Sequence, residues 1–345
     1  MLTVRVKLLP STAESRLLDA VMAEYISLVN DIVDYSIAVG GLPQISSASV
    51  VAPLPAALKN QCIRDAGSIW QKTLKRGGKF PALRKPAATW NNQNYSIEPD
   101  SISFPMWVDG RSRKIHVQAI IPEEVLSILQ NHKLGTLRIT QKNGRYIAQI
   151  AYKEVCAEPA VDGKTMGVDL GILCPAVSVT DDGKTRFYGN GRQNKFVRRR
   201  NKAKRRKLGK AKKLNAIRKL ENKEQRWMKD QDHKISRSIV NEAIRQGVST
   251  IKLEKLSGIR STARTSRKNN PSLHSWSFYR LSKFIEYKAR MAGIEVKCVD
   301  PKYTSQTCPV CGNRHKPNSR TYLCPDCGYR THRDRVGAVN ICHVA

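Results

Sequence analysis

Two Cys-X-X-Cys pairs near the carboxyl end place the tightest constraint on how this chain can fold. The pairs are Cys308–Cys311 and Cys324–Cys327, and Asp334 follows the last cysteine by seven residues. Four thiolates complete a tetrahedral Zn²⁺ shell and leave no open position for chemistry. The sequence therefore predicts a structural zinc site that joins two short loops, with any reactive group beside it.

The charge of the chain predicts a polyanionic partner. Lys and Arg total 61 against 28 acids, a net charge of +33. Nucleic acid is the expected partner, since cationic side chains release counterions from phosphate backbones. The segment from Arg192 to Arg226 is the most basic, and its only acids are Glu221 and Glu224. Its densest part supplies the predicted nucleic-acid-binding residues, Arg198, Arg199, Arg200, Lys202, Lys204, Arg205, Arg206 and Lys207.

The first half of the chain predicts a β domain interrupted by helices. Alternation predicts a strand at 2–9, and helical spacing predicts two helices after it. From about 95 to 155 the period changes to two, and Asn143-Gly144 predicts a tight hairpin. The expected domains are a β-barrel or small sheet (1–10 and 95–158) and an inserted helical piece (11–94).

The second half predicts an α/β domain of a particular order. Its expected elements are strands at 165–170, 176–179 and 185–188, a helical region at 195–246, a strand at 250–254, a helix at 275–292, a strand at 294–299 and a helix from Asp334. This is the order of an RNase H-like fold. The expected nuclease domain covers 159–305 and 329–345, with a zinc ribbon at 306–328 inserted before the last helix.

Three acidic residues stand where this order brings chain segments together. Asp169 interrupts an apolar strand, Glu254 ends another, and Asp334 begins a helix. Each has an ordinary interpretation: an edge-strand acid facing water, a solvated strand end, and a helix N-cap. In an RNase H-like layout they meet at one sheet edge, where three carboxylates could hold two Mg²⁺ or Mn²⁺ ions for phosphodiester hydrolysis.

Other polar residues near these positions have simpler roles. Asp300 is expected to cap a turn, and Asp181 and Asp182 to belong to one. His315 and His332 flank the cysteines, whose four thiolates already complete a zinc shell.

Several short motifs, in this order, resemble the TnpB family, the RNA-guided nucleases of insertion sequences that are related to type V CRISPR effectors. They are Gly167-Val-Asp-Leu-Gly-Ile172, His233-Lys-Ile-Ser-Arg237, Leu253-Glu-Lys-Leu256, Tyr303-Thr-Ser-Gln-Thr-Cys-Pro-Val-Cys-Gly312, His332-Arg-Asp334 and Asn340-Ile341. The matching motifs span about 165–342, and the amino-terminal half matches loosely.

The resemblance implies a RuvC-like nuclease domain with Asp169, Glu254 and Asp334 as its catalytic, Mg²⁺-binding triad. It also implies a wedge-type β domain with a helical recognition insert, and a guide RNA as partner. The chain has Val336 and Gly337 where Asn and Ala are frequent in the family, but it keeps the triad acid.

The expected function is an RNA-guided endonuclease that cuts double-stranded DNA next to a short target-adjacent motif. The alternatives are a catalytically silent RNA-guided regulator of the same architecture and a transposase acting directly on element ends. A monomer on one RNA is expected. The five cysteines outside the zinc pairs lie in apolar context and predict buried thiols in a reducing prokaryotic cytoplasm, near the nucleoid. They are Cys62, Cys156, Cys174, Cys298 and Cys342.

Overall fold

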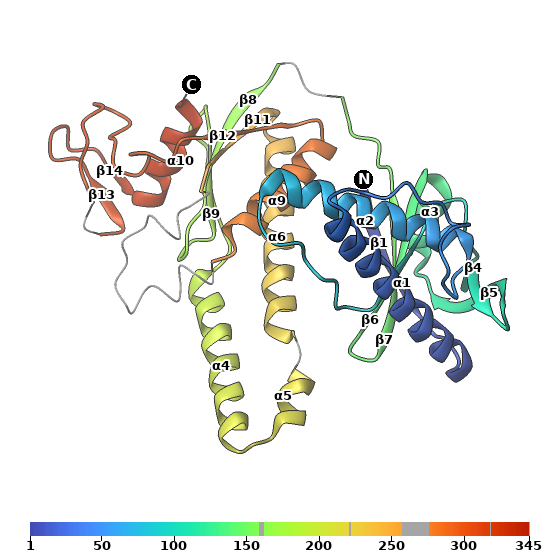
Figure 1. The fold of residues 1–345 in the computed structure, drawn as a ribbon. Coiled ribbons are helices and arrows are strands. Elements are labelled where there is room, and N and C mark those ends of the chain that lie inside the picture. The colour runs from blue at the N-terminus through green and yellow to red at the C-terminus, as the bar shows by residue number, and fades with distance from the viewer. Residues whose placement is uncertain (159–161, 221, 257–275, 318, 345) are drawn as a thin grey trace. The chain divides into compact units, whose positions relative to one another are not determined.

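The chain folds into two compact units, Met1–Glu154 and Val155–Ala345, in a computed structural model (Figure 1). The structure describes residues 1–158, 162–220, 222–256, 276–317 and 319–344. Five parts of the sequence predictions lie outside these residues: 159–161, 257–275 and 345 of the expected nuclease domain, 318 of the expected zinc ribbon, and Glu221 of the basic segment.

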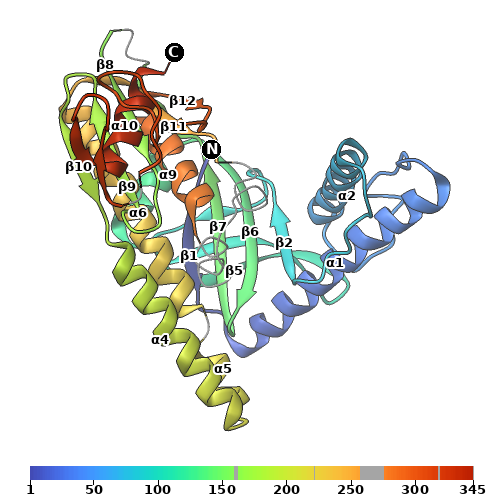
Figure 2. The same ribbon diagram turned by 90° about the vertical axis from the view of Figure 1, so that its left-hand side faces the viewer.

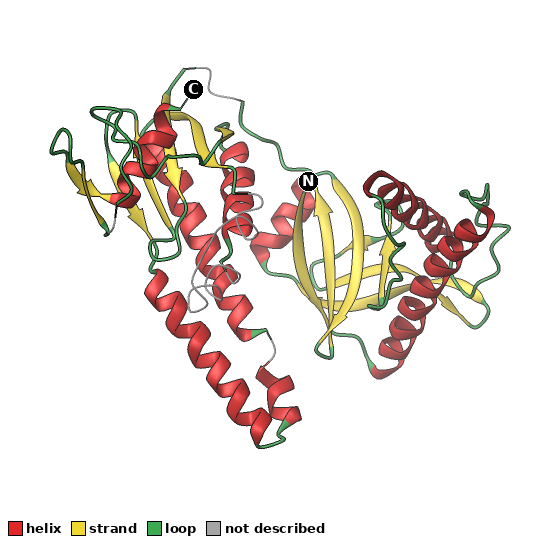
Figure 3. Ribbon diagram, turned by 60° about the vertical axis from the view of Figure 1, so that its left-hand side comes forward, coloured by secondary structure: helices red, strands yellow, loops and turns green. Residues whose placement is uncertain are grey.

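The first unit is built on a seven-stranded sheet that curls strongly (Figure 3). Its strand order is β2-β6-β7-β1-β5-β4-β3. The strands are β1 (Leu2–Leu8), β2 (Ala87–Trp90), β3 (Ser96–Ile97), β4 (Ser101–Val108), β5 (Arg111–Ile120), β6 (Leu134–Lys142) and β7 (Arg145–Tyr152). The hairpin between β6 and β7 is confirmed. Asn143 and Gly144 turn it with φ values of 55° and 70°, as a tight hairpin of the favoured twist requires.

Three helices accompany this sheet: α1 (Thr12–Val39), α2 (Ala56–Arg76) and α3 (Glu123–Asn131). Ser11 begins α1 with a complete capping box, since its backbone N–H donates to Glu14 Oε2 over 2.7 Å and its Oγ accepts from the Glu14 N–H. Helix α3 was not predicted, because the sequence of a short amphipathic helix is hard to distinguish from that of a strand. Strand β2 lies within the range expected to be helical, and it pairs with β6 because Ala88 and Trp90 are buried in the core of the unit.

The second unit is built on a five-stranded mixed sheet of order β10-β9-β8-β11-β12. The strands are β8 (Lys164–Asp169), β9 (Ala176–Thr180), β10 (Thr185–Tyr188), β11 (Val248–Glu254) and β12 (Glu295–Val299). Strands β8, β9 and β10 form an antiparallel meander, whereas β11 is parallel to both β8 and β12. Together with the helices below, the described elements follow the order expected from the sequence.

Helices cover both faces of this sheet (Figure 1). Helices α6 (Lys223–Arg245) and α9 (Phe278–Met291) lie on one face, and α10 (Arg333–His343) lies on the other. Helices α4 (Gly191–Lys210) and α5 (Leu214–Leu220) project beyond the sheet. Met166 and Val168 of β8 pack with Ile239 of α6 and Ile285 of α9 in one core. The alternate residues of β8 face α10 on the opposite side of the sheet. Figure 2 shows α4 running beside α6, with α5 at the far end of this helical pair.

A small two-stranded sheet precedes α10. Its strands are β13 (Thr321–Leu323) and β14 (Arg330–His332), and the second cysteine pair lies in the turn between them. The expectation that the remaining cysteines are buried is wrong for Cys156 and Cys298, which are exposed. Among the helices in the described ranges, none combines the length and apolar character needed to cross a bilayer.

Gly167 allows α10 to lie directly on β8. A Cβ atom at this position would come within 2.2 Å of the Ala338 carbonyl oxygen and 2.4 Å of the Cys342 backbone nitrogen. These neighbours are helix backbone, which cannot rotate away as a side chain can. Any side chain at position 167 would therefore push α10 off the sheet.

We expect Gly167→Ala to lower the free energy of unfolding by about 1–3 kcal/mol, the usual cost of overpacking a core. Gly209→Ala is the matched control, because the new methyl group would meet only Ile217 Cδ1 at 3.9 Å. Chemical denaturation monitored by circular dichroism measures both. Equal stability of the two variants would contradict the close contact.

Candidate functional site

The parallel pairing of β8 and β11 brings Asp169 and Glu254 to the same edge of the sheet. Gly167 pairs with Lys252 and Val168 with Leu253, so Asp169 and Glu254 are the next residues in register, at the two strand ends. Lys252 donates to the Cys342 carbonyl oxygen over 3.1 Å, which places it on the α10 side of the sheet. Glu254, two residues further on, shares that face because side chains alternate along a strand.

Asp334 lies in the first turn of α10 and is buried, with 8% of its surface exposed. The prediction that Asp334 is itself an N-cap is wrong: His332 caps the helix, and its Nδ1 accepts from the Asp334 backbone N–H over 3.2 Å. Nη1 of Arg320 instead donates to both oxygens of the Asp334 carboxylate, over 2.9 Å to Oδ1 and 3.0 Å to Oδ2. The side chain of Asp334 therefore does not cap the helix and is instead ion-paired with Arg320.

Gly337 provides the space into which Asp169 points. A Cβ atom on Gly337 would lie 3.0 Å from Asp169 Oδ2 and 3.1 Å from its Cγ. The Asp169 carboxylate therefore packs against bare backbone of α10, one turn after Asp334. The glycine by which this chain departs from the family pattern has a physical role, since it makes room for an acidic group.

The three carboxylates influence one another electrostatically. Burial raises the pKa of Asp169 well above its ordinary range, and the negative charges of Glu254 and Asp334 raise it further, against the opposing effect of Arg333 and Arg320. Burial also raises the pKa of Glu254, while a hydrogen bond from Thr304 opposes the rise. Acids with raised pKa values that face each other at one sheet edge are typical of a cation-binding or acid–base site.

A loop residue and a helix residue support Glu254. Thr304 is buried, and its Oγ1 donates to Glu254 Oε1 over 2.5 Å. The Asn340 amide of α10 donates to the carbonyl oxygens of Thr304 and Thr307, over 2.6 and 2.8 Å. Helix α10 therefore supplies Asp334 and, through Asn340, also positions the loop that orients Glu254.

The carboxylates are less tightly grouped than the cysteines. In the described part of the chain, only the four cysteine sulfurs form a set of potential ligand atoms lying within 4.8 Å of one another. The carboxylates are coupled by charge, but Asp334 is paired with Arg320 and the three do not converge to that distance. Their oxygen donors nevertheless match the ligand preference of Mg²⁺ and Mn²⁺.

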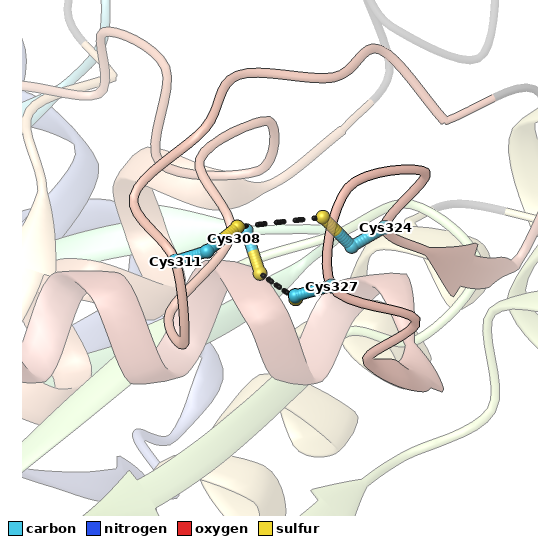
Figure 4. Close-up of side chains that lie close together, drawn as sticks. All are labelled: Cys308, Cys311, Cys324 and Cys327. Atoms are coloured by element: carbon cyan, nitrogen blue, oxygen red, sulfur yellow. Dashed lines mark hydrogen bonds between the residues drawn. The ribbon is translucent and has the colours of Figure 1, made fainter.

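The four cysteines form a cluster with the dimensions of a tetrahedral metal site (Figure 4). The Sγ atoms of Cys308 and Cys327 are 3.6 Å apart, and those of Cys311 and Cys324 are 3.5 Å apart. Metal–sulfur bonds of about 2.3 Å at tetrahedral angles imply a sulfur separation of about 3.8 Å. These distances exclude disulfides, whose sulfurs lie about 2.05 Å apart, and a metal ion fits the cluster.

The predicted nucleic-acid-binding residues lie on the basic helix α4 in three groups. Arg199, Lys202, Arg206 and Lys207 line a groove of about 420 Å³ that continues to Lys210. Arg200 and Lys204 are exposed outside it. The remaining two face α6: Arg205 forms an ion pair with Glu224 over 2.6 Å, and Arg198 is half-buried, where loss of solvation lowers its pKa. Periodicity within the basic run could have separated the groups, because Arg198 and Arg205 are seven residues apart.

Several residues of this site carried no recognisable signal in the sequence. Arg320, Thr304 and Gly337 each act through a contact with an acid that is 14 or more residues away in the chain. The simpler interpretations hold elsewhere: Asp300 Oδ1 accepts the Lys302 N–H in a turn, and Asp182 forms an ion pair with Lys164. His315 lies against the Tyr322 ring, with centroids 6.4 Å apart, beside the cysteines.

Comparison with known families finds two family models that resemble parts of the chain. A model described as the TNB domain of Cas12f1-like proteins matches residues 278–341, and a model described as a probable transposase, OrfB_IS605, matches residues 149–260. These ranges hold the five-stranded sheet, its helices and the cysteine cluster. The resemblance to the TnpB family that the motifs predicted is thus confirmed.

Individual relatives agree with this placement. A TnpB-like protein of Methanocaldococcus jannaschii is 36% identical over 127 residues, which cover 36% of this chain and 45% of the relative. A Cas12f1 of Sulfoacidibacillus thermotolerans is 38% identical over 128 residues, and a Cas12f1 of Syntrophomonas palmitatica is 26% identical over 339. These two matches cover 36% and 84% of this chain, and 29% and 67% of the relatives. The chain therefore spans less than half the length of the first two.

Solved structures show the same fold across almost the whole chain. The Cas12f1 in a cryo-electron microscopy structure with sgRNA and target DNA superimposes with a TM-score of 0.72 at 17% identity, covering 96% of this chain and 83% of that one. The mini RNA-guided endonuclease CRISPR-Cas_phi3 superimposes with a TM-score of 0.53 at 12% identity, covering 99% and 92%. The fold is therefore that of a multi-domain type V effector.

We expect Asp169→Asn to raise the melting temperature at pH 7 in the presence of a chelator. A raised pKa means that the folded protein binds the proton more tightly than the unfolded chain, so this carboxylate costs stability as the pH rises above about 4. The amide removes that cost, and the gain should disappear at low pH. Asp162→Asn, at an exposed position, is the control. A lower melting temperature for Asp169→Asn than for the control would contradict the proposed repulsion.

Proposed function

We propose that this chain is an RNA-guided DNA endonuclease of an insertion sequence, which cleaves double-stranded DNA beside a short target-adjacent motif. Asp169, Glu254 and Asp334 are its catalytic residues. The observation that carries the proposal is the half-buried Asp169 carboxylate, which is set against Gly337 at the end of β8. Loss of solvation and the two other acids raise its pKa. A fold gains nothing from such repulsion unless a cation or a proton is bound there.

The relatives support the choice of substrate. Two of the Cas12f1 relatives are named CRISPR-associated endodeoxyribonucleases, and the solved Cas12f1 carries sgRNA and target DNA. A net charge of +33 and the groove along α4 suit two polyanionic partners held by one protein. Guide RNA and double-stranded DNA are thus the proposed partners, with one chain on one RNA.

The division into domains follows the same proposal. Residues 159–305 and 329–345 form an RNase H-like (RuvC) nuclease domain, and 306–328 form its zinc ribbon. Residues 1–10 and 95–158 form a wedge-like domain, and 11–94 form the recognition insert, with β2 returning to the wedge sheet. Support comes from the order of the described strands and from the two compact units, which divide at Glu154.

The residues around the acids prepare them for a divalent cation. Bound to Asp169, Glu254 and Asp334, Mg²⁺ would activate water and stabilise the leaving oxygen of a phosphodiester. Thr304 binds one carboxylate oxygen of Glu254 and leaves the other available to a cation. Gly337 has no side chain, so nothing on α10 at that position crowds the Asp169 carboxylate. Arg320 holds Asp334 in place and, as a long partly exposed side chain, can turn to a phosphate when the acid takes a cation.

The cysteine cluster is proposed to hold structural Zn²⁺. Four thiolates fill a tetrahedral shell, and soft sulfur ligands retain zinc where the nearby carboxylates select a hard cation. The ribbon also positions catalytic groups, because Arg320 precedes β13 and the chain passes directly from β14 into α10. The metal therefore stabilises the approach of Arg320 to Asp334.

The Arg320–Asp334 ion pair favours one alternative, a catalytically silent RNA-guided regulator. In such a protein the arginine would replace the cation permanently, and target DNA would be bound without being cut. The two functions differ in a single measurable outcome, cleavage of bound DNA.

We expect the protein, purified with co-expressed RNA, to cut matched double-stranded DNA in Mg²⁺. Asp169→Ala should slow cleavage by about 100-fold or more, the usual cost of removing one electrostatic element of an active site. Asp300→Ala is the control, because that carboxylate only accepts a turn N–H. Gel analysis of end-labelled DNA across a library of flanking sequences measures the rates. Binding without cutting by the wild type would establish the silent regulator, and equal cutting by Asp169→Ala would show that the site is misassigned.

We expect about one zinc ion per chain by elemental analysis, since four thiolates hold one ion. Cys308→Ser should reduce the zinc content and, by loosening the ribbon, slow cleavage more than it weakens RNA binding. Cys298→Ser, which changes an exposed cysteine outside the cluster, is the control. Full zinc content in Cys308→Ser would contradict the assignment.

A further inference from the structure

A second charged feature of the nuclease unit lies away from the acids, on α6 and α9. These helices cover the face of the five-stranded sheet opposite α10. A groove of about 670 Å³ opens on their outer side, and Arg186 of β10 contributes to its wall. We name it the α6–α9 groove, and it is lined by Arg186, Lys234, Arg237, Glu242, Arg245 and Lys288, among others.

The single acid of this set is already neutralised. Glu242 is buried and accepts from Arg245 over 2.6 and 2.7 Å and from Arg186 over 2.5 Å. Burial raises its pKa, but these hydrogen bonds outweigh burial and lower it to about 2. Glu242 therefore stays ionised and orients two guanidinium groups at the wall of the groove. Of the other cations there, Lys234 forms a solvent-exposed ion pair with Asp230 over 2.8 Å.

Lys288 is a buried cation with neutral partners. Only 3% of its surface is exposed, and its Nζ donates to the His233 carbonyl oxygen over 2.7 Å and to Ser236 Oγ over 2.6 Å. Burial and the nearby charge of Arg237 lower its pKa to about 8. Its Nζ also lies over the rings of Phe284 and Tyr287, 5.9 and 5.8 Å from their centroids, but it forms no ion pair with a described carboxylate.

Arg237 adds to this excess. Its side chain is exposed, and it makes no ion pair with any residue in the described ranges. A fold would gain more from an apolar side chain at Lys288 than from an unpaired buried ammonium beside an arginine. An anion in the groove would compensate both charges.

The spacing of the cations indicates a chain of anionic groups. Lys234, Arg237 and Arg245 follow one side of α6 and span about 16 Å at 1.5 Å per residue. A nucleic-acid strand places one phosphate roughly every 3.4 Å along a helix axis. Several phosphates could therefore contact the whole row of cations, whereas a single small anion would contact only part of it. The rings of His233 and Phe284 are stacked, with their centroids 4.0 Å apart. The stacked faces of these two rings are therefore not available to a base.

We propose that the α6–α9 groove is a second nucleic-acid-binding site, which holds the phosphodiester backbone of the guide RNA or of the target DNA through Arg237, Lys234 and Lys288. It recognises backbone charge, because its exposed cations Lys234 and Arg237 can contact phosphates whatever the base sequence. This inference deepens the proposed function by naming a further contact with its partners.

Equilibrium binding of labelled oligonucleotides to the full-length protein tests the proposal. The probes are a single-stranded RNA, a single-stranded DNA and a DNA duplex, each of about 20 nucleotides or base pairs, roughly the length of a guide pairing. Chelator replaces Mg²⁺ throughout, so binding is measured without cleavage. Failure of the groove and failure of the endonuclease are therefore distinguishable.

The double variant Lys234→Gln/Arg237→Gln should bind several-fold more weakly, and the slope of log K against log salt should fall by roughly 2, one unit for each cation lost. Loss confined to the RNA probe assigns the groove to the guide, and loss confined to the DNA probes assigns it to the target. The control is Arg290→Gln, an exposed arginine of α9 that is paired with Glu286 at 3.4 Å and does not line the groove.

Lys288→Met separates binding from structural support. Methionine keeps the length of the side chain, and Ser236 Oγ still donates to the His233 carbonyl oxygen over 3.1 Å, so no acceptor is left without a partner. Without nucleic acid, the variant should melt at a higher temperature than the wild type, and it should bind the affected probe more weakly. Unchanged affinity and salt slope in the double variant for all three probes would overturn the proposal. So would a lower melting temperature with unchanged affinity in Lys288→Met.

Discussion

The contact between α10 and β8 at Gly167 is the constraint on which the candidate active site depends. Helix backbone can approach the strand this closely only because position 167 carries no side chain. The approach brings the first turn of α10, with Asp334, beside Asp169 at the strand end. It also lets Asn340 reach the loop carbonyl oxygens that position Thr304 against Glu254. One helix therefore determines the placement of all three acids relative to one another.

Uncompensated charge occurs twice in the second unit, with opposite signs. At the sheet edge, burial and mutual repulsion raise the pKa of Asp169, and at the α6–α9 groove burial and Arg237 lower that of Lys288. Both arrangements cost stability in the free protein, and in both an oppositely charged ligand offsets the cost. A protein that must hold a divalent cation on one face of a sheet and phosphates on the other is expected to carry this pattern.

Strong local patterns predicted most of the elements. The capping box at Ser11, the hairpin at Asn143-Gly144 and the strand that ends at Glu254 are all present, because each depends on neighbours within a few residues. Strands β2 and β3 and the pair β13–β14 were missed. They are two to four residues long, too short for alternation to show, and their hydrogen bonds come from partners elsewhere in the chain. Cys156 and Cys298 were misjudged because apolar neighbours in sequence do not guarantee burial.

The sequence by itself determined the chemistry available to this protein: four thiolates at metal-binding spacing, three acids in a recognisable order, and a large excess of positive charge. Only the tertiary structure decided how these groups are used. It turned Arg198 and Arg205 toward α6 while their neighbours line a groove, and it paired Asp334 with Arg320. It also left Lys288 buried among neutral acceptors. The reason is physical: residue type sets which interactions a side chain can make, whereas burial and partners arise from packing between segments far apart in the chain.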